Sequence, residues 1–337
     1  MRCITLAVEL IKRKCQVTFI CRNLSGNHIN IALEKKIKVC MIDINSSLNS
    51  SKENNDISDK RQFQLNDFEE TKLLLHDDYP DLLIIDHYDL DIIWENEMQP
   101  YVSKIMAIDD LGNRKHDCQI LLDQNDDNVK KYTKLVPSSC MLLLGPKYVL
   151  LRDEFRNINL RKYKAPSRVK RILIFYTSGF DKGETLKALK GILHSEEKYY
   201  VDVIVGKNNL NYIEINDICT NNNWSLHIQI DFIAELMSKA DLIFGSGGSA
   251  SWERCVLGIP SVVSILAKNQ ESIAFDLDRL GAIINLGWHD EITLFDYSIV
   301  LNIVDTKKLE KLSHQATKIV NKDGVSMVAD KLLTRMR

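Results

Sequence analysis

The sequence predicts an α/β protein made of two doubly wound, Rossmann-type domains. Short apolar segments alternate with segments of helical periodicity along both halves of the chain, which is the pattern of parallel sheets covered by helices. A basic, proline-containing stretch separates the two halves. We therefore expect a first domain over residues 1–155, a linker over 156–169 and a second domain over 170–337.

The first half is predicted to begin with a helix, because apolar residues recur at helical spacing over residues 2–14. Apolar runs predict strands at 16–21, 37–44, 81–86, 104–108, 119–122 and 141–144. Helical spacing predicts a short helix that opens at Ser25 and longer helices at 66–75 and 91–101. The segment 45–60 is polar and has no periodicity, so we expect a surface loop there.

Polar residues follow several of these strands. They are Asp86-His87-Tyr88, Asp109-Asp110, Asp123-Gln124-Asn125 and Gly145-Pro146. In doubly wound folds ligands bind beyond the carboxyl ends of the strands, so these residues are candidates for a site. Ordinary turn chemistry is the alternative, since Asp, Asn, Gly and Pro are favoured in turns for backbone reasons.

The second half repeats the alternation and contains a glycine-rich turn. Strands are predicted at 171–176, 201–205, 225–230, 242–244 and 262–266, and helices at 184–193, 210–221 and 232–238. After the strand at 242–244, a turn with Gly245, Gly247 and Gly248 leads into a helix that opens at Ser249 or Ser251. Free amides at a helix start favour an anion such as a diphosphate. A purely structural need for glycine between strand and helix is the alternative.

Composition excludes several classes of protein. The 337 residues carry 44 Lys and Arg against 46 Asp and Glu, so the net charge is −2 and no overall field favours nucleic acid. The eight cysteines show no C-x-x-C pairing, and no apolar run reaches the roughly 20 residues of a membrane span. We expect a soluble, cytoplasmic protein without zinc, disulfides or membrane contact.

Several uncommon motifs occur in one order along nearly the whole chain. They lie at 85–91 with 94–95, 108–118, 121–125, 144–155, 247–255 and 269–270. Together they resemble the UDP-2,4-diacetamido-2,4,6-trideoxy-β-L-altropyranose hydrolase family of pseudaminic acid biosynthesis, including its spore coat polysaccharide relatives. The resemblance implies a GT-B-like fold in which the second domain binds UDP and the sugar lies at an interdomain cleft. It also implies inverting hydrolysis of a UDP-sugar without a metal or a cofactor.

The resemblance carries over to individual residues. Tyr88 and Asn269 correspond to catalytic positions of the family and are expected to face each other across the cleft. The residues expected to bind the nucleotide are Gly179, Gly247, Gly248, Ser249 and Glu253, and those expected to bind the sugar are Asp86, His87 and Gln270.

Two positions depart from the family pattern. Relatives tend to have Gly-Gly-x-Asp where this chain has Ser178-Gly179-Phe180-Asp181. The N-terminal signature of the family resembles G-x-G-H-x-M-R-C, and this chain begins at its Met-Arg-Cys. The resemblance therefore implies that the first strand and the catalytic histidine lie upstream of Met1. Since the first strand of a doubly wound sheet is central, we expect residues 1–337 to fold poorly and to hydrolyse little.

Two other functions fit the same residues. One is a GT-B glycosyltransferase that passes a sugar from UDP to an acceptor hydroxyl, and the other is a non-catalytic nucleotide-sugar binder. If the chain is fully active as it stands, His87 is the first candidate for a substitute base, although it also fits a structural role beside Tyr88. The sequence does not indicate the oligomeric state or the particular sugar.

Overall fold

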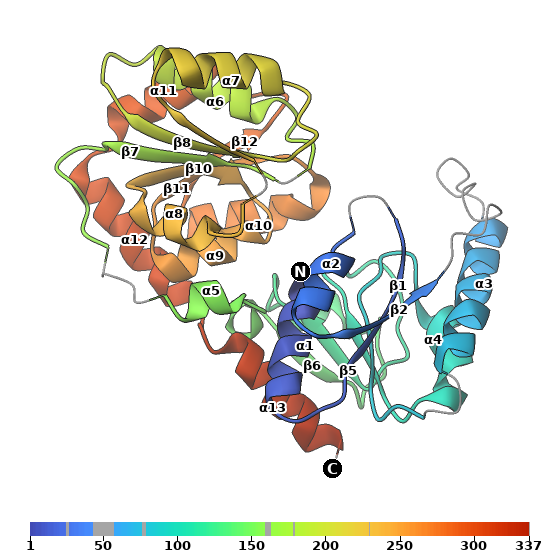
Figure 1. Ribbon diagram of the computed structural model, residues 1–337. Helices are drawn as coiled ribbons and strands as arrows, with labels where there is room; N and C mark the ends of the chain where they lie inside the picture. Colours follow the sequence, from blue (N-terminus) through green and yellow to red (C-terminus); the bar gives the residue numbers. More distant parts are fainter. Residues whose placement is uncertain are drawn as a thin grey trace. The chain divides into compact units, whose positions relative to one another are not determined.

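The computed structural model describes residues 1–24, 27–42, 57–75, 79–158, 163–177, 179–228 and 230–336. It divides into two compact units, residues 1–152 with 323–337 and residues 153–322. The predicted C-terminal limit of the second domain is therefore wrong. Helix α13 (Gly324–Met336) packs on α1 (Arg2–Lys12), because Val325, Val328 and Leu332 are buried in the core of the first unit (Figure 1).

The first unit is built from parallel strands and helices. Its strands are β1 (Thr18–Arg22), β2 (Lys38–Ile42), β3 (Leu83–Ile85), β4 (Ile105–Ile108), β5 (Ile120–Asp123) and β6 (Met141–Leu144). Besides α1 and α13, its helices are α2 (Ile29–Glu34), α3 (Ile57–Leu75), α4 (Ile92–Met98) and the short 3-10 helices η2 (Gln99–Tyr101), η3 (Val129–Lys131) and η4 (Pro146–Tyr148). Every strand pair that the structure describes in this unit is parallel.

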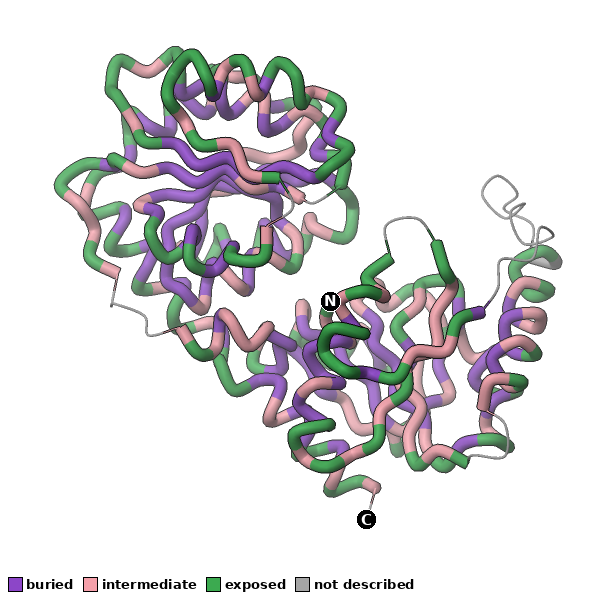
Figure 2. The backbone as a smooth tube through the Cα atoms, in the orientation of Figure 1, coloured by how far each residue is buried: buried purple, intermediate pink, exposed green. Residues whose placement is uncertain are grey.

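Alternating side chains of β4 enter two cores on opposite faces of the sheet. Met106 and Ile108 pack with Leu6 of α1 and with α13 on one face. Ile105 and Ala107 pack with α3 and α4 on the other face. Because successive side chains of a strand point to opposite faces, a helical layer covers each face of the sheet, as the apolar runs predicted. Figure 2 shows the buried strands between the exposed helix surfaces.

The strands of the first unit form two separate sheets. One contains β1 and β2, and the other has the order β3-β4-β5-β6. Within the described residues, β3 is therefore an edge strand, and its Leu83 and Ile84 are only partly buried, unlike the fully buried β4. The central position that the sequence analysis expects for a further strand stays a prediction.

The second unit contains one parallel sheet with the order β12-β11-β10-β7-β8-β9. Its strands are β7 (Arg171–Phe175), β8 (Tyr200–Val205), β9 (Ser225–Ile228), β10 (Leu242–Ser246), β11 (Ser261–Ile265) and β12 (Ile284–Trp288). Its helices are α5 (Asp153–Arg156), α6 (Glu184–Leu193), α7 (Tyr212–Asn221), α8 (Ile233–Lys239), α9 (Ala250–Leu257), α10 (Lys268–Arg279), α11 (Leu294–Ile303) and α12 (Thr306–Ile319).

Helices cover both faces of this second sheet. Helices α6, α7 and α11 lie on one face, and α8, α9, α10 and α12 lie on the other (Figure 1). The sheet is doubly wound because the chain runs outward from β7 in both directions, to β8 and β9 and then to β10, β11 and β12. The carboxyl ends of β7 and β10 therefore lie side by side at the point where the order reverses.

Several predicted boundaries need correction. Gly245 belongs to strand β10, not to the turn that follows it. The predicted linker is not free chain throughout, since the Tyr163 hydroxyl donates to the Asp241 carbonyl at 3.0 Å in the second unit. Residues 57–60 of the predicted loop belong to α3, whereas residues 45–56 lie outside the described residues, as do Ser25 and Ser178.

The open edge of β3 predicts uneven protection of backbone amides. Leu83 N donates to Lys104 O at 2.9 Å, so the next amide, that of Ile84, points toward the other side of the strand. We expect the Ile84 amide to exchange with solvent about 100-fold faster, or more, than that of Ala107 in the interior strand β4. Hydrogen exchange measured by NMR checks this, and equal protection of the two amides would contradict the edge assignment.

Candidate functional site

The first group of candidate residues lies at the carboxyl edge of the β3–β6 sheet. Arg2 Nη2 and Nε donate to the two carboxylate oxygens of Asp86 at 2.7 and 2.9 Å. Arg2 Nη1 donates to Asp110 Oδ2 at 3.0 Å, so one guanidinium joins the ends of β3 and β4. Burial raises the pKa of Asp86, but the hydrogen bonds and charge of Arg2 outweigh it and hold that pKa below its usual value. Asp86 is therefore an ionised, engaged carboxylate.

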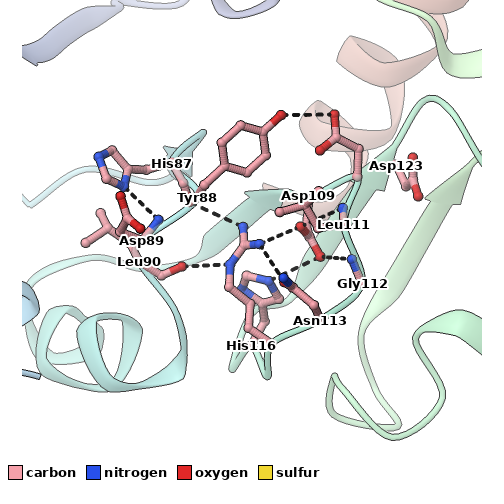
Figure 3. Close-up of polar contacts among 12 residues, drawn as sticks. His87, Tyr88, Asp89, Leu90, Asp109, Leu111, Gly112, Asn113, His116 and Asp123 are labelled. Carbon is pink, nitrogen blue, oxygen red and sulfur yellow. Dashed lines mark hydrogen bonds and ion pairs between the residues drawn. The ribbon is translucent and has the colours of Figure 1, made fainter. Parts of the chain in front are cut away.

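Tyr88 points toward the same carboxylate edge. Its hydroxyl lies 3.5 Å from Asp110 Oδ2, a long hydrogen bond that Figure 3 shows, and the side chain is 47% exposed. Asn125 Nδ2 donates to the same oxygen at 3.2 Å. Asp110 thus gathers Arg2, Tyr88 and Asn125 from separate segments, which makes it the centre of the polar edge.

His87 does not share this edge. Its Nδ1 accepts a hydrogen bond from the Asp89 amide at 3.1 Å, and its ring stacks on Phe63 at 6.0 Å between centroids. The hydrogen bond assigns the proton of the neutral ring to Nε2, so the basic lone pair on Nδ1 is already engaged. These contacts fit a structural role for His87.

A buried charge cluster supports the strand end at Asp109. His116 Nδ1 lies 2.6 Å from Glu95 Oε1. Arg114 Nη1 donates to Asp109 Oδ1 at 2.8 Å, a contact drawn in Figure 3. Burial lowers the pKa of His116, but two carboxylates outweigh it and raise the pKa to about 9: that of Asp109, 3.7 Å from Nε2, and that of Glu95, hydrogen-bonded to Nδ1. Burial likewise raises the pKa of Asp109, while His116 and Arg114 bring it down to about 2. The cluster is charged at neutral pH.

The sequence left two explanations for the polar residues at the strand ends, a ligand site and ordinary turn chemistry, and each applies to different residues. Asp109 accepts from the amides of Leu111 and Gly112, and Asp123 accepts from the amides of Asn125 and Asp126, so both perform turn chemistry. Asp110 instead binds side chains from other segments.

The second group of candidate residues lies where β10 leads into α9. Gly247 N donates to Ser264 O of β11 at 3.0 Å, which fixes the start of the turn. Ser251 N and Trp252 N donate to Gly248 O and Ser249 O. The amides of Gly248, Ser249 and Ala250 have no hydrogen-bond partner among the described residues. Consecutive open amides at a helix start form an anion-binding arrangement.

Gln270 lies directly against this turn. Its side-chain oxygen accepts from the Leu266 amide at 3.0 Å, and a β-carbon built on Gly248 would lie 3.4 Å from its Nε2. Asn269 occupies the first turn of the same helix, α10, and is exposed. Glu253 lies in the first turn of α9 and is partly buried. The structure therefore places Gln270 against the turn within the second unit, and the binding roles expected of Glu253 and Asn269 stay predictions.

Gly179 is less closely connected to this group. It follows β7, is exposed, and donates its amide to Thr177 Oγ1 at 3.1 Å. A β-carbon at Gly179 would meet only Thr177 at 3.7 Å, which is ordinary contact, so packing in the described residues does not require glycine there. A role for Gly179 in binding stays a prediction.

Two classes of feature are absent from the described part of the chain. No helix there is long and apolar enough to cross a bilayer. No group of three or more His, Cys, Asp or Glu side chains in the described ranges could hold a metal ion.

Comparison with known sequences identifies one characterised relative. The UDP-2,4-diacetamido-2,4,6-trideoxy-β-L-altropyranose hydrolase of Campylobacter jejuni is 29% identical over 213 residues, which cover 62% of this chain and 74% of the relative. The resemblance to this hydrolase family is confirmed. An uncharacterized Methanocaldococcus jannaschii protein, MJ1062, is 26% identical over 195 residues. That match covers 55% of this chain and only 40% of the archaeal protein. No family model matches the chain.

Comparison with solved structures confirms the GT-B-type fold class. MurG of Acinetobacter baumannii superposes with a TM-score of 0.64 at 16% identity, covering 99% of this chain and 95% of that protein. The calicheamicin glycosyltransferase CalG4 gives 0.64 at 12% identity, with coverage of 98% and 93%. At these identities the likeness shows the fold alone.

Sequence reasoning missed two arginines that organise these groups. Arg2 lies in a predicted helix and Arg254 follows Glu253, but neither had been assigned a role. A signal for Arg254 existed, since an arginine in the otherwise apolar stretch 254–257 is either exposed or buried with partners. For Arg2 the signal was its place in the Met-Arg-Cys of the family signature, but its partners could not be foreseen because they are more than 80 residues away in sequence.

The charged state of His116 predicts a pH dependence of stability. Its pKa in the folded protein is about 9 against an ordinary 6.5, so its stabilisation is complete below about pH 6.5 and is lost as the pH rises through 9. The shift corresponds to about 3 kcal/mol at most. We expect the wild-type free energy of unfolding to fall between pH 6 and pH 9.5 by more than that of His116→Gln. Urea titrations at the two pH values measure this, and parallel curves would contradict the charged assignment.

Proposed function

We propose that this chain belongs to an enzyme that hydrolyses a UDP-linked 2,4-diacetamido-2,4,6-trideoxy sugar to UDP and the free sugar. One observation carries the proposal: open amides at the start of α9 lie beside Gln270, within motifs that resemble those of the hydrolase family. The likeness to MurG and CalG4 supports a nucleotide-sugar fold but not a particular reaction.

The glycine turn would hold the diphosphate in this proposal. Amides of Gly248, Ser249 and Ala250 and the positive end of the α9 dipole favour an anion there. Glu253, one turn into the helix, would accept hydrogen bonds from ribose hydroxyls. UDP is a good leaving group once its charge is held, so the reaction then needs chiefly the activation of water.

The polar edge of the first unit would receive the sugar. Tyr88 is exposed and can donate a hydrogen bond, and Asp86 and Asp110 are both bound by Arg2. Asp86 is a poor base because its pKa lies below the ordinary value. We propose that Tyr88 is a substrate-contacting residue of the first unit and Asn269 one of the second.

The general base is the remaining element of the proposal. His87 is unsuited because its Nδ1 is already hydrogen-bonded. Arg2 and Cys3 both bond to Asp86, so a residue directly preceding Met1 would lie close to this edge. The resemblance implies the histidine of the family's G-x-G-H-x-M-R-C signature as the base, and this assignment stays a prediction.

An assay of UDP release tests the function. We expect residues 1–337 to release little UDP from the diacetamido sugar nucleotide, since loss of a general base costs about 10² to 10⁴ in rate. A version extended upstream by a strand and a G-x-G-H-type loop should release UDP at the same rate with or without an acceptor and with or without EDTA. Release that requires an acceptor would indicate a glycosyltransferase, and full activity of 1–337 would contradict the upstream base.

The turn predicts the effect of a larger residue at Gly248. A β-carbon there makes only contacts of 3.4 Å or more in the ligand-free protein, so Gly248→Val should fold but crowd a bound phosphate. We expect UDP affinity by calorimetry to fall at least about tenfold. Gly245→Ala is the contrasting variant, because its β-carbon would lie 2.7 Å from Phe175 O and should lower the melting temperature instead. Unchanged UDP affinity in Gly248→Val would count against the site.

The sugar edge predicts separate effects on turnover and nucleotide binding. In the extended version, Tyr88→Phe and Asn269→Ala should each lower kcat/KM by about 10-fold or more, while UDP affinity stays within twofold. Exposed Tyr79→Phe is a matched control for the loss of a tyrosine hydroxyl. Turnover that stays at the wild-type level in both variants would show that neither residue contacts the substrate.

A further inference from the structure

The largest fully buried side chain among the described residues is a cation, that of Arg254 in α9. It is 1% exposed, and burial lowers its pKa to about 10, although the nearby charge of Glu253 acts in the opposite direction. A buried arginine is costly unless it is well compensated. Its presence beneath the glycine turn therefore requires an explanation.

The contacts of Arg254 bracket the glycine turn. Nη2 donates to Ser246 O, the last residue of β10, at 2.6 Å, and to Ser251 Oγ in α9 at 2.8 Å. Both acceptors are uncharged, and between them lie Gly247, Gly248, Ser249 and Ala250. Nε and Nη1 have no hydrogen-bond partner within the described ranges. The positive charge is thus incompletely compensated in the ligand-free protein.

Gly245 leaves the space that this guanidinium occupies. A β-carbon at residue 245 would lie 3.0 Å from Arg254 Nη1 and 2.7 Å from Phe175 O. The glycine of β10 therefore makes room for the buried cation and the neighbouring strand, whereas Gly247 and Gly248 of the turn lie against Gln270 of α10. The strand, turn and helix are built around Arg254.

We propose that Arg254 is a positioning residue for the phosphates, whose charge beneath the turn both holds the open amides in place and attracts the anion that binds them. The inference rests on the proposed function, which supplies the diphosphate. A diphosphate bound to the turn would be attracted by the guanidinium on the other side of the turn. Because the guanidinium is buried, water screens this attraction poorly. The guanidinium, being fully buried, does not touch the ligand.

Two substitutions distinguish the effect of the charge of Arg254 from the effect of its hydrogen bonds. Arg254→Gln keeps a donor for Ser246 O and removes the charge, whereas Arg254→Lys keeps the charge with a different donor geometry. Calorimetry with uridine, UMP and UDP reports how the effect depends on phosphate. Arg279→Gln, an exposed position in α10 of the same unit, controls for the change in net charge.

We expect Arg254→Gln to weaken UDP binding about tenfold or more and UMP binding by less, with uridine affinity within twofold of wild type. Arg254→Lys should recover most of the UDP affinity, and Arg279→Gln should bind as wild type does. Equal losses for uridine and UDP, or equal losses in the Gln and Lys variants, would overturn the proposal. So would failure of both variants to fold, because the role would then lie in the fold alone. Absence of UDP binding by the wild-type chain would instead overturn the proposed function, and this inference with it.

Discussion

Parallel strand pairing is the constraint on which the rest of this structure depends. Every pair of neighbouring strands in the described residues is parallel, from β1 with β2 to β8 with β9. Each strand must then return through a helix or a long crossover, so the carboxyl ends of a sheet gather at one edge. In each unit that edge carries the candidate residues: Asp86 and Asp110 in one, and the 247–249 turn in the other. The candidate sites thus follow from the topology.

Arginine organises both edges, in different electrostatic states. Arg2 has two carboxylate partners, and these outweigh burial and raise its pKa. Within the described residues, the hydrogen-bond acceptors of Arg254 are a carbonyl and a hydroxyl, and burial lowers its pKa. A compensated cation stabilises a fixed arrangement, whereas an uncompensated one leaves positive potential for an anion. This difference supports the proposal that the phosphates bind in the second unit and the neutral sugar in the first.

The sequence predicted the strands and helices well where periodicity decides them, as in β4, β10 and α6. It predicted the glycine turn but wrongly included Gly245 in it. Pairing with β7 and β11 extends strand β10 as far as Ser246, and this pairing cannot be read from the local sequence. It could not predict that α13 returns to the first unit, since its apolar face fits either core by composition. Nor could it single out Asp110 from Asp109, because the distinction depends on Arg2, which lies 108 residues away in the chain.

The central claim is that UDP binds at the start of α9. It is tested most directly by NMR on protein labelled with ¹⁵N-glycine, in which UDP is titrated against the amide signals. The account predicts that the signals of Gly247 and Gly248 move with UDP and much less with uridine, while those of Gly112 and Gly145 in the first unit stay in place. Shifts confined to Gly112 and Gly145, with Gly247 and Gly248 unmoved at saturating UDP, would contradict it.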